Sequence, residues 1–174
     1  MLRKKRKKGQ MEISFQMIFS LILIAAFIYA AFVGIRYFLA TADQVKINSF
    51  ISELQSKVDQ TWMTTETSQT YKLSLPAKIK YVCFADSTIA KNMLIKDCSD
   101  FEAYIPIFKS QSMNMFFCPS KEVWKTSAPI YAKISCKGKD CLEFSGIPYC
   151  IANTKTGISI TLEKTYGAQK IKLS

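Results

Sequence analysis

Apolar residues dominate residues 17–35, after a start that is rich in basic residues. Residues 17–35 contain no charged side chain and consist largely of Leu, Ile, Phe, Val and Ala. As an α-helix this run would be about 28 Å long, close to the hydrocarbon thickness of about 30 Å of a bilayer. The pattern therefore predicts a transmembrane helix, which we place at residues 11–40.

After residue 40 the apolar residues become periodic, at every third or fourth position. They are Ile47, Ile51, Leu54, Val58 and Trp62, with polar and charged residues between them. This spacing predicts an amphipathic helix over residues 41–62 that extends from the span, since no proline interrupts it. The apolar stripe must be buried, either against the chain's own head domain or against the same helix of another subunit.

The segment 63–70 is rich in Thr, Ser and Gln and is predicted to be a linker. From residue 71 the apolar period falls to two, which predicts a β-rich domain over residues 71–174. Short strands are expected at 71–75, 79–85, 114–118 and 130–136, helical turns within 89–95 and 101–108, and a terminal hairpin formed by 157–164 and 170–173. The expected fold class is α+β, with a long N-terminal helix followed by a small, mostly antiparallel β head.

Charge is concentrated before the helix. Six basic residues occupy positions 3–8, within a leader that we place at residues 1–10. Basic residues flanking a span stay in the cytoplasm, so the leader is expected to be cytoplasmic and the C-terminal domain extracytoplasmic. A secretory signal peptide cut near Ala40, Thr41 and Ala42 is the competing interpretation. The basicity of the remaining chain is modest and gives no argument for a nucleic-acid partner.

The leader and the start of the helix contain a recognisable short motif. Residues 7–12, KKGQME, followed by an apolar helix, resemble the class III signal of archaeal type IV pilin-like proteins. The resemblance covers about the first 35 residues. It implies that a prepilin peptidase cuts between Gly9 and Gln10 and leaves the helix on the mature chain. The family usually has glutamate at the fifth mature position, where this chain has Ser14 and places Glu12 at the third.

Glu12 has two interpretations, because a carboxylate at the edge of the hydrocarbon needs a cation or headgroups. The resemblance implies that it pairs with the new α-amino group of a neighbouring subunit. The alternative is that Glu12 pairs with the adjacent lysines at the lipid interface and has no further role.

All six cysteines follow residue 80. An even number in an extracytoplasmic domain indicates disulfides, although six cysteines allow fifteen pairings. Our preferred set joins Cys83 with Cys150, Cys98 with Cys118, and Cys136 with Cys141. Free buried thiols are an alternative. A zinc site is disfavoured because the chain has no histidine and no Cys-x-x-Cys pair.

Residues suited to catalysis are scarce. The absence of histidine removes the commonest general base, and the glycines are scattered rather than clustered in a phosphate loop. Asp97, Asp100 and Glu102 lie close in sequence. Two interpretations are open, a cation site and a solvated acidic turn. We expect no catalytic residue, no metal site and no cofactor.

These observations favour a non-enzymatic, single-span surface protein. The first hypothesis is a pilin-like subunit or assembly component of a type IV pilus-like structure, whose partners are the lipid bilayer, a prepilin peptidase, and copies of itself or other pilin-like subunits along the N-terminal helix. The alternative is a permanently membrane-tethered extracytoplasmic binding module with an uncleaved signal anchor.

Overall fold

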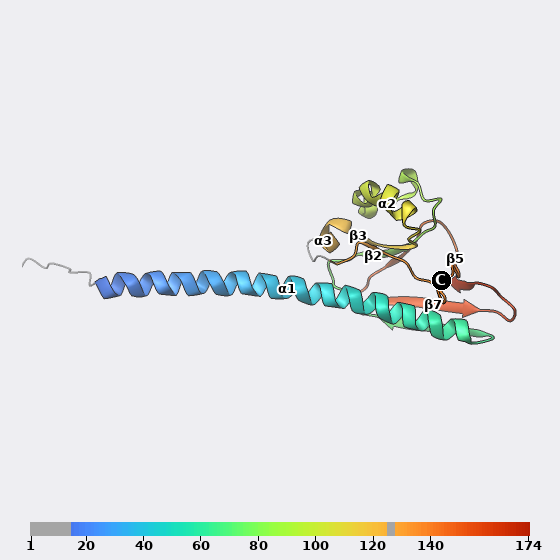
Figure 1. The fold of residues 1–174 in the computed structure, drawn as a ribbon, viewed down its shortest axis with the longest axis horizontal. Coiled ribbons are helices and arrows are strands. Elements are labelled where there is room, and N and C mark those ends of the chain that lie inside the picture. The colour runs from blue at the N-terminus through green and yellow to red at the C-terminus, as the bar shows by residue number, and fades with distance from the viewer. Residues whose placement is uncertain (1–14, 125–127) are drawn as a thin grey trace, which may run out of the picture. The chain divides into compact units, whose positions relative to one another are not determined.

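The computed structural model describes residues 15–124 and 128–174 (Figure 1). The chain divides into two compact units, one ending at Leu39 and the other spanning Ala40–Ser174. A single helix, α1 (Phe15–Met63), supplies the described part of the first unit and the beginning of the second. A small β domain, mostly antiparallel, follows it. The predicted α+β class is confirmed at this level.

The first part of α1 is predominantly apolar, with Arg36 the one charged residue among residues 17–39, and it is uncovered. Every residue from 17 to 39 is exposed, including Phe27, Ile28 and Phe32. Within the described residues, α1 is the one helix long and apolar enough to cross a membrane. The predicted span began at residue 11, and residues 11–14 lie outside the described part of the chain.

The second part of α1 is amphipathic and belongs to the domain. Ile47, Phe50, Leu54 and Val58 are fully or almost fully buried in the domain core. Phe50 packs edge-on against Phe117, with ring centroids 5.9 Å apart. The spacing of three and four residues keeps these side chains on one face of the helix. The domain's own core, rather than another subunit, therefore covers this stripe.

The first sheet has the strand order β1-β7-β8-β5. Its strands are β1 (Thr67–Leu73), β7 (Ile158–Lys164), β8 (Ile171–Leu173) and β5 (Leu142–Phe144). β7 and β8 form the predicted terminal hairpin, which is confirmed, and β1 pairs antiparallel with β7 along its whole length. Ile158, Ile160 and Leu162 alternate with more exposed residues, so one face of β7 lies on the core.

The second sheet has the order β4-β3-β2-β6 and is antiparallel throughout. Its strands are β2 (Tyr81–Phe84), β3 (Met115–Cys118), β4 (Tyr131–Ala132) and β6 (Tyr149–Ala152). All of β3 is buried, because the sheet is covered on both faces. On one face of the sheet, Phe117 packs against Phe50 of α1. On the other face, Phe116 stacks on Phe101, with ring centroids 4.0 Å apart.

Short helices form the layer on the face of this sheet opposite α1 (Figure 1). They are the 3-10 helices η1 (Lys91–Met93) and η2 (Lys96–Tyr104), and the α-helices α2 (Ile105–Ser110) and α3 (Ser120–Trp124). Pro106 lies in the first turn of α2, where its missing N–H costs no helical hydrogen bond. Phe101 and Phe108 anchor this layer by packing edge-on with ring centroids 5.5 Å apart.

Several boundaries differ from those expected. Residues 67–70, assigned to the linker, are the first part of β1 and pair with β7. These residues are Thr, Ser and Gln because this part of the strand is mostly exposed, so they lack the apolar alternation that predicts a strand. The hydroxyls of Thr70 and Thr161 lie 2.9 Å apart across the two strands. The structure also contains β5 and α3, which we did not predict, and the compact unit begins at Ala40 rather than at residue 71.

The boundary at Ala40 predicts which fragment folds. A fragment of residues 40–174 should unfold cooperatively on heating, followed by circular dichroism. A fragment of residues 71–174 should show no cooperative transition, because losing four buried helix side chains removes on the order of 8 kcal/mol, as much as many domains have in total. Cooperative unfolding of the shorter fragment would show that the helix is dispensable.

Candidate functional site: the disulfide cluster and the exposed apolar helix

Three disulfides link the domain. They join Cys83 to Cys150, Cys98 to Cys118, and Cys136 to Cys141, the same pairs as in our sequence interpretation. Cys83 and Cys150 are register partners on β2 and β6, with Cα atoms 4.0 Å apart. No cysteine among the described residues is free.

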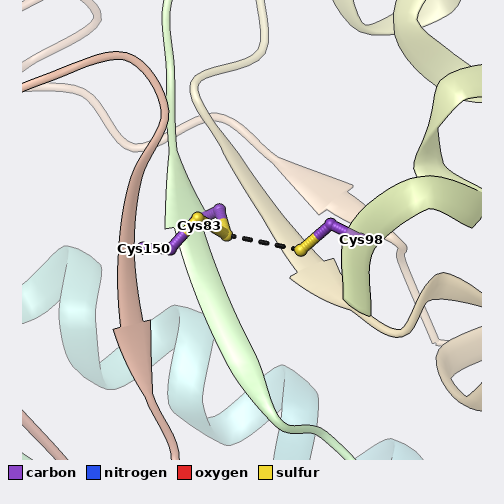
Figure 2. Close-up of side chains that lie close together, drawn as sticks. All are labelled: Cys83, Cys98 and Cys150. Carbon is purple, nitrogen blue, oxygen red and sulfur yellow. Dashed lines mark hydrogen bonds between the residues drawn. A yellow bond between two sulfur atoms is a disulfide. The ribbon is translucent and has the colours of Figure 1, made fainter. Parts of the chain in front are cut away.

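Two of these disulfides touch inside the core. Cys83 Sγ lies 3.7 Å from Cys98 Sγ, and Figure 2 shows the two side chains pointing toward each other from β2 and η2. The sulfurs of Cys83, Cys98 and Cys150 lie within 4.8 Å of one another. A metal would need thiolates, and all three sulfurs are bonded in disulfides. In this state the cluster is a covalent cross-link rather than a ligand set.

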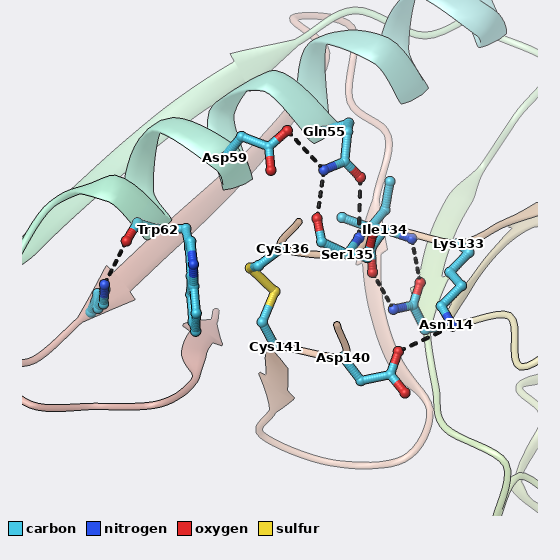
Figure 3. Close-up of a disulfide and its surroundings, with 11 residues drawn as sticks. Gln55, Asp59, Trp62, Asn114, Lys133, Ile134, Ser135, Cys136, Asp140 and Cys141 are labelled. Atoms are coloured by element: carbon cyan, nitrogen blue, oxygen red, sulfur yellow. Dashed lines mark hydrogen bonds and ion pairs between the residues drawn. A yellow bond between two sulfur atoms is a disulfide. The ribbon is translucent and has the colours of Figure 1, made fainter. Parts of the chain in front are cut away.

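The third disulfide closes a tight turn that two amide side chains hold in place (Figure 3). Gln55 on α1 donates to the Ser135 carbonyl at 2.6 Å and accepts from the Ser135 N–H at 3.1 Å. Asn114 does the same for Ile134, at 2.6 and 2.8 Å. The two amide side chains bond to the backbone N–H and C=O groups of this segment, as a neighbouring strand would. They fix the segment before Cys136 between the helix and β3.

Lysine side chains bind near both ends of the part of α1 that belongs to the domain. At the C-terminal end, Lys164 Nζ donates to the carbonyls of Trp62 and Thr64 at 2.6 and 2.8 Å, where the helix dipole favours a cation. Near Ala40, Lys78 lies 2.9 Å from Asp43, whose hydrogen bond and charge raise the pKa of Lys78. Because the pKa of Lys78 is raised, the pair stabilises the folded state while Lys78 is protonated. The stabilisation is lost as the pH rises through the pKa of Lys78. It contributes little because Lys78 is half exposed.

The acidic residues singled out from the sequence have separate partners. Asp97 pairs with Lys80 at 3.1 Å, and Glu102 pairs with Lys91. Asp100 accepts the backbone N–H at the start of α3. The three carboxylates therefore stabilise η2 and its neighbours rather than converging on one point. Gly9, Gln10 and Glu12 lie outside the described residues.

Sequence reasoning missed a cavity of about 350 Å³ beside β5. Its polar lining includes Asp86, Asp140, Glu143 and Lys170. Asp86 accepts hydrogen bonds from Thr88, and Asp140 forms an ion pair with a nearby lysine at 3.4 Å. Two of the three carboxylates are thus already engaged. No motif predicts the cavity, because its lining comes from segments far apart in the chain.

Comparison of the chain with protein-family models, curated proteins and solved structures finds no match. The class of the protein therefore follows from its own sequence and fold. It is a small disulfide-linked α+β domain that follows an apolar helix long enough to span a bilayer.

The contribution of each disulfide to the free energy of unfolding should increase with the length of the loop that it closes. Their sequence separations are 67, 20 and 5 residues, which the chain-entropy model converts to about 4, 3 and 2 kcal/mol. Paired serine substitutions at Cys83 and Cys150 should cost the most, and those at Cys136 and Cys141 the least, in denaturant unfolding of residues 40–174. The reverse order would mean that loop closure does not govern their contribution.

Proposed function

We propose that the protein is a non-enzymatic, single-span surface protein. In this proposal helix α1 anchors the domain to the membrane. The observation that carries this proposal is the exposure of every residue from 17 to 39 on an uncharged stretch broken only by Arg36. At about 25 cal/mol per Å² of apolar surface, leaving such a segment in water would be very unfavourable. A bilayer is the environment that fits it.

The proposed orientation places the leader in the cytoplasm and the domain outside. Two independent features support it. Six basic residues precede the helix, and basic flanks remain cytoplasmic. The domain carries three disulfides, which persist in oxidising compartments.

The finer proposal is a pilin-like subunit, or a component that assists assembly of a type IV pilus-like structure. It rests on the motif of residues 7–12 and its resemblance to the archaeal class III signal. Cleavage after Gly9 would leave Gln10 as the new N-terminus, with Glu12 available to pair with a neighbouring subunit. Copies of this chain or related subunits would then associate through the apolar helix.

A membrane-tethered binding module is the second candidate. The cavity beside β5 favours it, because Glu143 and Lys170 offer opposite charges next to the apolar side chains of Phe144 and Ile147. In that case the leader stays on the chain and the helix serves only as an anchor.

Leader processing distinguishes the two candidates. Intact-mass analysis of membrane-extracted protein should show a chain that begins at Gln10. The substitution Gly9→Leu should block cleavage and leave residues 1–9 in place. Gly34→Leu is the matched control, because no atom lies within 4 Å of a Cβ added at Gly34, and it should be processed normally. Wild-type protein that keeps residues 1–9 would support the tethered module instead, and loss of everything before about residue 43 would indicate a signal peptide.

Membrane placement is tested separately. The protein should stay with the membrane after an alkaline carbonate wash, and protease added to intact cells should digest a C-terminal tag placed after Ser174. Replacing the six basic residues at positions 3–8 with serine should reduce the digested fraction, because the orientation signal is lost. Release by carbonate, or a tag protected in the wild type, would contradict the anchor or its orientation.

A further inference from the structure

The contact between two buried disulfides has a chemical consequence. Thiol–disulfide exchange needs a thiolate that can approach a disulfide sulfur. Cys83 Sγ and Cys98 Sγ belong to different disulfides and lie 3.7 Å apart, in van der Waals contact. A thiolate formed at either sulfur would therefore have the other disulfide as its immediate neighbour (Figure 2).

The four cysteines of these two disulfides differ in how deeply the residues are buried. Cys83, Cys98 and Cys118 are all fully buried. Cys150 is partly exposed, because it lies on β6, which ends the strand order of the second sheet. Of the four cysteines, Cys150 is therefore the one most open to an external thiol, whereas both members of the Cys98–Cys118 bond are buried.

We propose that Cys150, Cys83, Cys98 and Cys118 form an exchange relay that carries reduction from the surface into the core. The thiolate of an external dithiol attacks Cys150 Sγ, forming a mixed disulfide and releasing the Cys83 thiolate. Cys83 then attacks Cys98 Sγ, so the Cys83–Cys98 bond forms and the Cys118 thiolate leaves. The second thiol of the reductant resolves the mixed disulfide and frees Cys150. One dithiol is oxidised, and the protein gains two thiols in place of one disulfide.

The exchange changes which elements are linked. In the starting state β2 is bonded to β6, and η2 is bonded to β3. After exchange the Cys83–Cys98 bond links β2 to η2, while β6 and β3 are released. The helical layer thus stays covalently attached to the second sheet in both states, and the edge strand β6 becomes free of its cross-link.

Single serine substitutions test the relay in the full-length, detergent-extracted protein. In Cys118→Ser the unpaired Cys98 lies against the Cys83–Cys150 disulfide, so exchange should release Cys150. In the matched control Cys98→Ser the unpaired thiol is Cys118, and the sulfur that contacts Cys83 is gone. After hours at about pH 8.5, the samples are quenched with acid, denatured, alkylated and mapped by peptide mass spectrometry, with fragmentation to separate Cys141 from Cys150.

In Cys118→Ser, at least about a tenth of the alkyl label should be on Cys150 rather than Cys98, accompanied by a Cys83–Cys98 linked peptide. In Cys98→Ser the label should be confined to Cys118. Label on Cys98 alone in the first variant, with the Cys83–Cys150 bond intact, would overturn the relay.

Wild-type protein supplies a second measurement that does not depend on a variant folding. Limiting dithiothreitol should produce a two-thiol species that contains the Cys83–Cys98 bond, with alkylated Cys118 and Cys150. Partial reduction that passes to the fully reduced chain without any Cys83–Cys98 linkage would equally overturn the proposal.

Discussion

Burial of one helical stripe is the interaction on which the domain depends. Ile47, Phe50, Leu54 and Val58 project from α1 into the core, and Phe50 meets the second sheet at Phe117. The same helix is apolar on every side before Ala40 and apolar on one side after it. This change in pattern reflects two surroundings. A helix packed on a domain needs a single apolar face, whereas a helix in lipid needs apolar residues all round.

Hydrophobic burial is non-directional, so other contacts must fix the register of the pieces. Gln55 and Asn114 do this by binding consecutive backbone groups at Ile134 and Ser135, as a β-strand would. Lys164 fixes the end of α1 by donating hydrogen bonds to the carbonyls of Trp62, in its last turn, and Thr64, just beyond it. The helix is thereby set at defined points against β7 and against the segment that follows β4, in addition to its apolar packing.

The sequence predicted those features that repeat along the chain. The helix with its apolar stripe and the hairpin of β7 and β8 have clear periods, and the cysteine pairs of the structure are those of our preferred set. Features that depend on distant partners were missed. Polar residues 67–70 form a strand because β7 lies beside them, and β5 pairs in parallel with β8 across a long connection. The cavity beside β5 has no local signal for the same reason.

The two longer-range disulfides are confined to the second sheet and the helical layer that covers it. The first sheet contains two seven-residue strands paired along their whole length, and neither of the two longer-range disulfides involves it. Both instead join β2, β3, β6 and η2. There the strands are at most four residues long, and the covering layer includes 3-10 helices, whose hydrogen-bond geometry is poorer. The two longer-range disulfides thus cross-link elements that are short or have the poorer hydrogen-bond geometry of a 3-10 helix.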